Sequence, residues 1–150
     1  MPPSYTQLEI FTEQVYGSLI KQLLHVLKVS EDAVCQKVAS HLGKSLGLIE
    51  AIRQTRNNAL SKQQFAMLPA DLCGKHQVSE NMIFQGKDST QLSSVVFELA
   101  NFANAHLEAA RALKKQVPAQ AVPAFYVAVF CNTFLVRLKK NRFNMFAHEM

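Results

Sequence analysis

The 150-residue sequence contains only three cysteines, and they lie far apart. Cys35, Cys73 and Cys131 form no C-x-x-C pair, which removes the usual signature of a structural zinc site. Three separated cysteines also argue against a disulfide framework. The cysteine content therefore fits a protein of a reducing compartment.

Clusters of side chains that could carry catalysis are also scarce. The eleven carboxylates include no D-x-x-x-D motif, and Glu9 and Glu13 are the one pair spaced four residues apart. A pair near a helix start is typical of solvated first-turn charges, so we expect both to face water. No G-x-S-x-G elbow is present. The five histidines lack helical metal-site spacing, and we expect them on the surface or hydrogen-bonded in the core: His25, His41, His76, His106 and His148.

Signals for targeting and for membrane spanning are weak. The segment Met1–Gln14 carries no lysine or arginine, whereas presequences need early positive charge, so no presequence is predicted in this chain. The longest apolar run, Val122–Val136, is interrupted by Pro123, Asn132 and Thr133 and is shorter than the ~20 residues that a bilayer requires. This run is predicted to be a core helix or an interfacial helix.

The charge that is present is basic and spread out. The formal net charge is +5 and the pI is about 9.2, which would favour an anionic partner. The one dense run, Arg137–Arg142, is typical of a solvated helix C-terminus. No RNA-binding aromatic signature or zinc-finger spacing accompanies it, so nucleic acid is not an expected partner.

Apolar periodicity predicts an all-α protein with one domain over residues 1–150. Apolar residues make up 49% of the chain and charged residues 18%, as in globular proteins. No stretch alternates with the period of a β-strand. Helical spacing predicts long helices over residues 8–29, 34–55, 89–113 and 125–138, with short helical turns between residues 70 and 86.

Local signals set the expected ends of these helices. Ser30 is predicted to cap the second helix, Ser79 the short helical turns before Gly86, and Asp88–Thr90 the fourth helix. The polar run Arg56–Gln64 is predicted to be a loop, and Pro123 is expected in the first turn of the last helix. Gly43 and Gly47 lie four residues apart on the second helix, where small residues favour close packing of another helix over a ligand wall.

One helix and the segments after it resemble the squalene/phytoene synthase family. The helix Ala39–Arg53 matches the family pattern that ends in arginine before an acidic D-x-x-x-D, and Phe65–Leu72 returns through Leu68-Pro69. His76-Gln77-Val78-Ser79 stands where the family has H-G-V-S, and an alanine-rich helix, Val117-Pro118 and a further helix follow. The resemblance implies part of an isoprenoid-synthase-type helical bundle, corresponding to its C-terminal portion.

The resemblance also implies a change in chemistry. Active family members hold magnesium with two aspartate-rich motifs, and the magnesium neutralises a prenyl diphosphate. Here the second motif is degenerate, with Gln54, Asn57 and Asn58 at its positions. The expectation is a pseudoenzyme without a catalytic residue, metal or cofactor. A remnant of the cavity would be lined by four residues: His41, Gly43, Gly47 and Arg53.

Within the family, the same features resemble a branch that assists assembly of mitochondrial respiratory complex I. That branch implies a location in the matrix or on the inner membrane and protein partners in complex I biogenesis. Two alternatives stay open: a magnesium-dependent prenyltransferase, and a peripheral lipid-binding module that uses Phe125–Arg142 on inner-membrane lipid.

Helices that are apolar on more than one face predict an open surface. Leu46, Ile49, Phe125 and Val129 are expected to be exposed where the rest of a family bundle would lie. We therefore expect the isolated chain to be marginally stable, to self-associate and to bind hydrophobic dyes.

Overall fold

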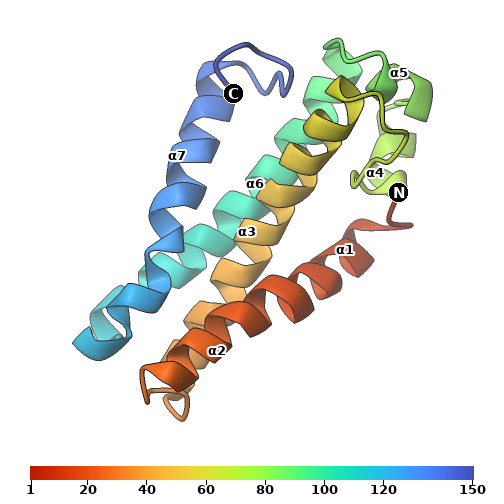
Figure 1. The fold of residues 1–150 in the computed structure, drawn as a ribbon. Helices are drawn as coiled ribbons and strands as arrows, with labels where there is room; N and C mark the ends of the chain where they lie inside the picture. Colours follow the sequence, from red (N-terminus) through yellow and green to blue (C-terminus); the bar gives the residue numbers. More distant parts are fainter.

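A computed structural model describes all 150 residues as helices joined by short connections, without a strand. Figure 1 shows α3 (Ala33–Leu60) running through the middle, with α6 (Thr90–Ala112) beside it. An arm formed by α1 (Tyr5–Thr12) and α2 (Ser18–Val26) crosses one side of α3, and α7 (Val127–Lys140) lies on the other side. The predicted all-α fold is confirmed.

The first predicted helix is one continuous arm that contains a wider turn. It consists of α1 (Tyr5–Thr12), the π-helical segment η1 (Glu13–Gly17) and α2 (Ser18–Val26). The Ser4 side chain caps the start by accepting a hydrogen bond from the Gln7 amide. Lys28, at φ 59°, ends the arm in the left-handed conformation that commonly terminates helices. The π-turn adds a residue where the arm crosses α3.

The central helix α3 differs from its prediction at both ends. Asp32, and not Ser30, is the N-cap, because its carboxylate accepts from the Cys35 amide at 2.8 Å. The helix also continues through most of the predicted loop and ends at Leu60. Ala59 is buried in the added turn, and Thr55 is buried just before it, so packing against the core outweighs the polar composition of the segment.

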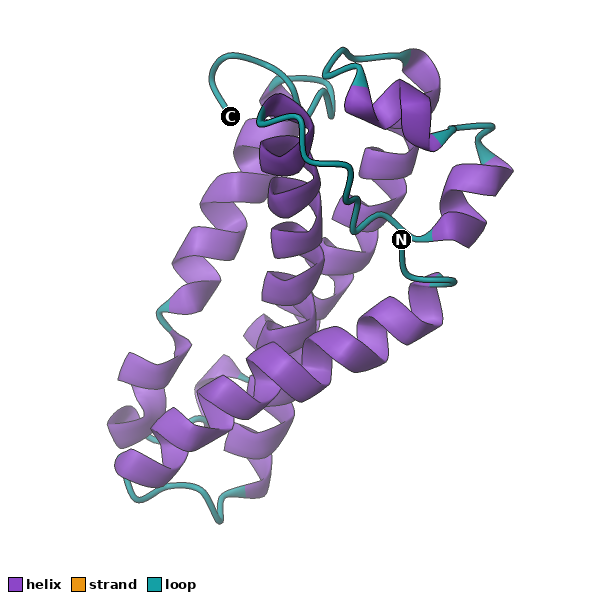
Figure 2. Ribbon diagram, turned by 45° about the vertical axis from the view of Figure 1, so that its right-hand side comes forward, coloured by secondary structure: helices purple, strands orange, loops and turns teal.

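Two short helices connect α3 with α6. These are α4 (Ala70–Lys75) and α5 (Glu80–Phe84), and the predicted Ser79 cap accepts a hydrogen bond from the Met82 amide. Figure 2 shows both at the end of the bundle near the N-terminus. His76 anchors this connection, because its Nε2 lies 2.7 Å from Oε1 of Glu98 on α6.

Pro123 does not open the last α-helix. It lies inside η3 (Ala119–Phe125), a 3-10 segment, and α7 begins at Val127 after a 42° bend. A proline lacks the amide hydrogen that an α-helix interior needs, whereas the short 3-10 turn tolerates it. No single helix is long and apolar enough to cross a membrane, and only η3 and α7 together reach that length and composition. Residues of α7 such as Cys131 and Leu138 are buried in the core.

One hydrophobic core extends along both sides of α3 and is completed by α6. Of the residues expected on an open surface, Val129 is 67% exposed, whereas Leu46 and Phe125 are half-buried. The expectation for Ile49 was wrong, since this side chain is fully buried. Ile49 belongs to the hydrophobic core cluster around α3.

Candidate functional site

Most of the residues singled out from the sequence lie on α3. Gln54, Asn57 and Asn58, the positions at which a degenerate motif was expected, lie on its last turns. Gln54 is exposed, with its Nε2 3.4 Å from the Tyr16 hydroxyl, and Asn57 is exposed as well. Asn58 donates from Nδ2 to the Phe65 carbonyl at 2.9 Å, which ties the end of α3 to the returning chain.

These positions do not fit the magnesium ions of the family. Mg²⁺ binds hard oxygen ligands and depends on carboxylate charge beside a diphosphate. The side chains of Gln54, Asn57 and Asn58 are neutral amides, and the Asn58 amide already donates a hydrogen bond to a backbone carbonyl. No group of three or more histidine, cysteine, aspartate or glutamate side chains is placed to hold a metal ion.

Arg53 lies on the face of α3 next to these amides. Its guanidinium forms an ion pair with Glu50 one turn earlier. It also lies 5.3 Å from the ring centroid of Phe130 on α7, within the range of a cation–π contact. Arg53 therefore links the α3 surface to α7.

Gly43 and Gly47 form the crossing between α3 and the first arm. A Cβ on Gly43 would lie 2.3 Å from the backbone nitrogen of Gly17, and one on Gly47 would lie 2.2 Å from Cβ of Thr12. Only glycine allows helices to approach this closely. The predicted close helix packing at both glycines is confirmed. Gly47 also borders a hollow of about 250 Å³ between α1 and α3, together with Tyr16 and Gln54.

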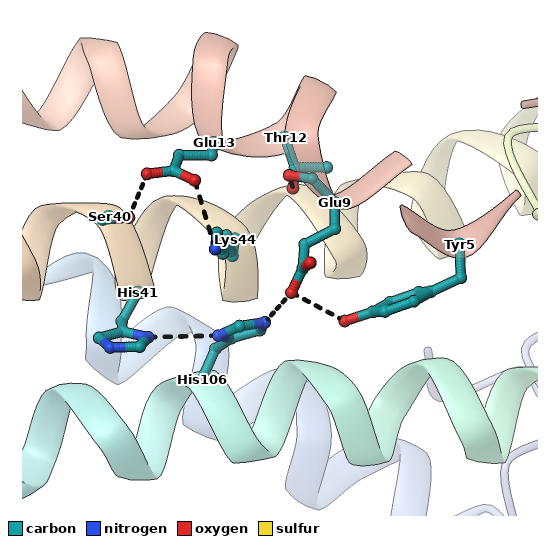
Figure 3. Close-up of polar contacts among 8 residues, drawn as sticks. All are labelled: Tyr5, Glu9, Thr12, Glu13, Ser40, His41, Lys44 and His106. Atoms are coloured by element: carbon teal, nitrogen blue, oxygen red, sulfur yellow. Dashed lines mark hydrogen bonds and ion pairs between the residues drawn. The ribbon is translucent and has the colours of Figure 1, made fainter. Parts of the chain in front are cut away.

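His41 belongs to a chain of polar contacts that the sequence did not predict (Figure 3). Nδ1 of His41 lies 3.3 Å from Nδ1 of His106 on α6. Nε2 of His106 lies 2.7 Å from Oε1 of Glu9 on α1. The Tyr5 hydroxyl donates to the same Glu9 oxygen at 3.1 Å. These polar contacts therefore join α1, α3 and α6, which are distant in sequence.

Glu13 makes a second link between the arm and α3. The Ser40 hydroxyl donates to its Oε1, and Nζ of Lys44 lies 3.3 Å from its Oε2. The expectation that Glu9 and Glu13 face water was wrong. Helical spacing turns both carboxylates toward α3 and α6, where each finds hydrogen-bond donors (Figure 3).

The surroundings shift the pKa values of this cluster. The hydrogen bond from Ser40, aided by Lys44, lowers the pKa of the Glu13 carboxyl. Burial, and then the neighbouring His106, lower the pKa of His41. Burial and the adjacent Glu9 raise the pKa of Tyr5 well above its ordinary value. These shifts keep Glu13 charged and favour neutral forms of His41 and Tyr5.

The four residues expected around a remnant of the cavity do not surround one space. His41 faces α6, Gly43 and Gly47 face the first arm, and Arg53 faces α7. Tyr5, Glu9, His41 and His106 make their polar contacts with one another. This cluster therefore holds α1, α3 and α6 together. Sequence reasoning missed this cluster because 97 residues separate Glu9 from His106.

Comparisons with known proteins agree with this architecture. The family model of squalene/phytoene synthase matches residues 1–150. The NADH dehydrogenase (ubiquinone) complex I, assembly factor 6 of Mus musculus is 34% identical over 143 residues, which cover 95% of this chain and 42% of that protein. The Drosophila melanogaster homolog is 35% identical over 141 residues, covering 93% and 41%, and the Homo sapiens protein is 31% identical over 140 residues.

A solved structure shows the same fold. The squalene synthase HpnC from Alicyclobacillus acidocaldarius matches with a TM-score of 0.81 at 11% identity, over 95% of this chain and 54% of that one. The chain spans about two fifths of the length of its curated relatives. With the family match over every residue, this chain belongs to the squalene/phytoene synthase family.

Proposed function

We propose that this chain assists the assembly of mitochondrial respiratory complex I, in the matrix or on the matrix side of the inner membrane, without synthase activity. The observation that carries the proposal is the identity of 29–35% to proteins named complex I assembly factor 6 over 93–95% of the chain. The protein partners would then be components of complex I biogenesis.

The proposed lack of synthase activity is supported by the uncharged side chains on the last turns of α3. The positions that should carry carboxylates are Gln54, Asn57 and Asn58, and uncharged amides give no charge to offset a dication held against a diphosphate. Asn58 and Gln54 instead contact the protein itself. The prenyltransferase alternative lacks its metal ligands on this helix.

A pyrophosphate-release assay tests this part of the proposal. The protein is incubated with farnesyl or geranylgeranyl diphosphate and Mg²⁺, and an active squalene synthase is run in parallel as the positive control. We expect no release above a blank without protein. Magnesium-dependent release from this chain would contradict the proposed lack of activity.

Peripheral contact with inner-membrane lipid is part of the same proposal. It is supported by the outward face of α7, where Val129 and Val136 are exposed, and by the exposed basic residues Arg137, Lys139 and Lys140 at its end. Each basic residue near an anionic surface contributes about 1 kcal/mol, and salt screens this attraction. We expect the protein to sediment with cardiolipin vesicles at low salt and to be released at high salt. Failure to sediment at low salt would remove the lipid contact from the proposal.

A further inference from the structure

The two histidines of the polar cluster in Figure 3 meet head-on. Nδ1 of His41 and Nδ1 of His106 are 3.3 Å apart, whereas the ring centroids are 5.6 Å apart, so both nitrogens lie between the two rings. A hydrogen bond between two imidazole nitrogens needs one N–H donor and one nitrogen with a free lone pair. The contact therefore holds one hydrogen and has no place for a second.

The other partner of His106 decides which of its nitrogens carries a hydrogen. Its Nε2 lies 2.7 Å from Oε1 of Glu9, an acceptor that also receives the Tyr5 hydroxyl, so Nε2 is assigned as protonated. In the neutral pair, Nδ1 of His106 then accepts a hydrogen bond from Nδ1 of His41. With one added proton, the His106 imidazolium donates from Nδ1 to His41, and the Glu9 carboxylate balances its charge. Both states keep the contact.

A second proton breaks the contact between the histidines. It would place two N–H groups and two positive charges opposite one another at 3.3 Å. Lys44, which faces His41 from α3 itself, adds to the repulsion. The carboxylates of Glu13 on η1 and Glu9 on α1 act in the opposite direction. Both carboxylates already have partners, however, since Glu13 pairs with Lys44 and Glu9 with His106.

We propose that Tyr5, Glu9, His106 and His41 form a proton-sensitive clasp, which holds α1 on α3 and α6 while the two histidines carry at most one positive charge and releases α1 when both are charged. The His106 side chain is 16% exposed, so it can turn toward water once the imidazoles separate. Glu9 and the Tyr5 hydroxyl then lose their link to α6.

The direction of the pH dependence follows from the surroundings of His41. Burial, and then the charge of His106, lower the pKa of His41, so the folded protein favours its neutral form. The resulting stabilisation is complete above the ordinary histidine pKa of about 6.5, and it is lost as the pH falls through the lowered pKa. The clasp is therefore closed at neutral pH and opens in mildly acidic solution.

Hydrogen exchange of the backbone amides at pH 7.5 and pH 5 tests the clasp. The protection factor is the intrinsic exchange rate divided by the observed rate, and this ratio removes the pH dependence of exchange itself. We expect the protection factors of residues 8–12 in α1 to fall about tenfold or more between the two pH values, while circular dichroism shows that the helices remain. Glu13 stays charged in this range because its pKa is lowered.

Two glutamine variants identify the group that titrates. In His41→Gln the side chain is neutral at both pH values and its amide can still donate to or accept from His106, so the fall in protection should disappear. His25→Gln is the matched control, because His25 is exposed on α2 of the same arm, and it should keep the full fall. In an NMR titration of the unsubstituted chain, the His41 ring should titrate at a lower pH than the His25 ring.

Four results would overturn the proposal. These are unchanged protection of α1 at pH 5, an equal fall in His41→Gln, a His41 ring that titrates at or above the pH of His25, and protection factors of α1 that equal those of the core of α6, residues 95–103, at both pH values. The last result would mean that α1 opens only when the whole bundle unfolds. The measurement requires no complex I, so its result is independent of the proposed function.

Discussion

Replacing Gly43 by alanine is expected to lower the free energy of unfolding by about 3 kcal/mol, the upper range for overpacking of a core. The added Cβ would lie 2.3 Å from the backbone nitrogen of Gly17 and 2.4 Å from its Cα. Backbone atoms cannot rotate away as a flexible side chain can. The arm would have to separate from α3, which would also disturb the contacts of Glu13 with Ser40 and Lys44.

Gly74→Ala is the matched control for this substitution. Gly74 lies in α4, and a Cβ there would meet no atom within 4 Å. Alanine should therefore leave stability unchanged or raise it by up to about 1 kcal/mol, because it restricts the unfolded chain and favours helix. Urea unfolding followed by circular dichroism compares the two variants. Equal midpoints for Gly43→Ala and Gly74→Ala would show that the helices do not cross as closely as described.

Replacing Glu9 by alanine is expected to lower the free energy of unfolding by about 2 kcal/mol. The change removes the acceptor of the Tyr5 hydroxyl and the carboxylate partner of His106 at once. The Glu9 side chain is only 24% exposed, so water cannot fully replace what is lost. Glu108→Ala is the control, because Glu108 pairs with Arg111 at 56% exposure and should cost less than 1 kcal/mol.

A double-mutant cycle of Glu9→Ala and His106→Ala separates the contribution of the Glu9–His106 contact to the free energy of unfolding from the other effects of each substitution. If Glu9 and His106 stabilise each other, the loss in the double variant will be smaller than the sum of the two single losses. Additive losses, or a Glu9→Ala effect as small as that of Glu108→Ala, would mean that the contact contributes little to stability.

The elements that the sequence predicted well are those set by local signals. The Ser79 and Ser89 caps follow from side chains that bond to amides three residues ahead. The long apolar repeat of α6 gives a helix in nearly the predicted place. Gly43 and Gly47 were informative because their spacing on one helix face is itself a packing signal.

The features that the sequence did not predict depend on distant partners. Glu9 resembles an ordinary solvated helix charge until α6 brings His106 within 2.7 Å. The polar composition after Thr55 predicted a loop, but Ala59 is buried and the helix extends to Leu60. Ile49 was wrongly predicted to be exposed. Helical periodicity identifies the apolar faces of a helix, but it does not show which neighbouring helix covers each face.

Rescue of complex I in mouse cells that lack complex I assembly factor 6 tests the proposed role most directly. The cells express a chimaera in which this chain replaces the matched region of the mouse protein. We expect NADH oxidation by complex I and the amount of assembled complex to recover toward the level given by the mouse protein, and the Gly43→Ala chimaera to recover less. A chimaera that accumulates in mitochondria as well as the mouse protein does, yet leaves complex I as low as in cells with an empty vector, would contradict the proposed role.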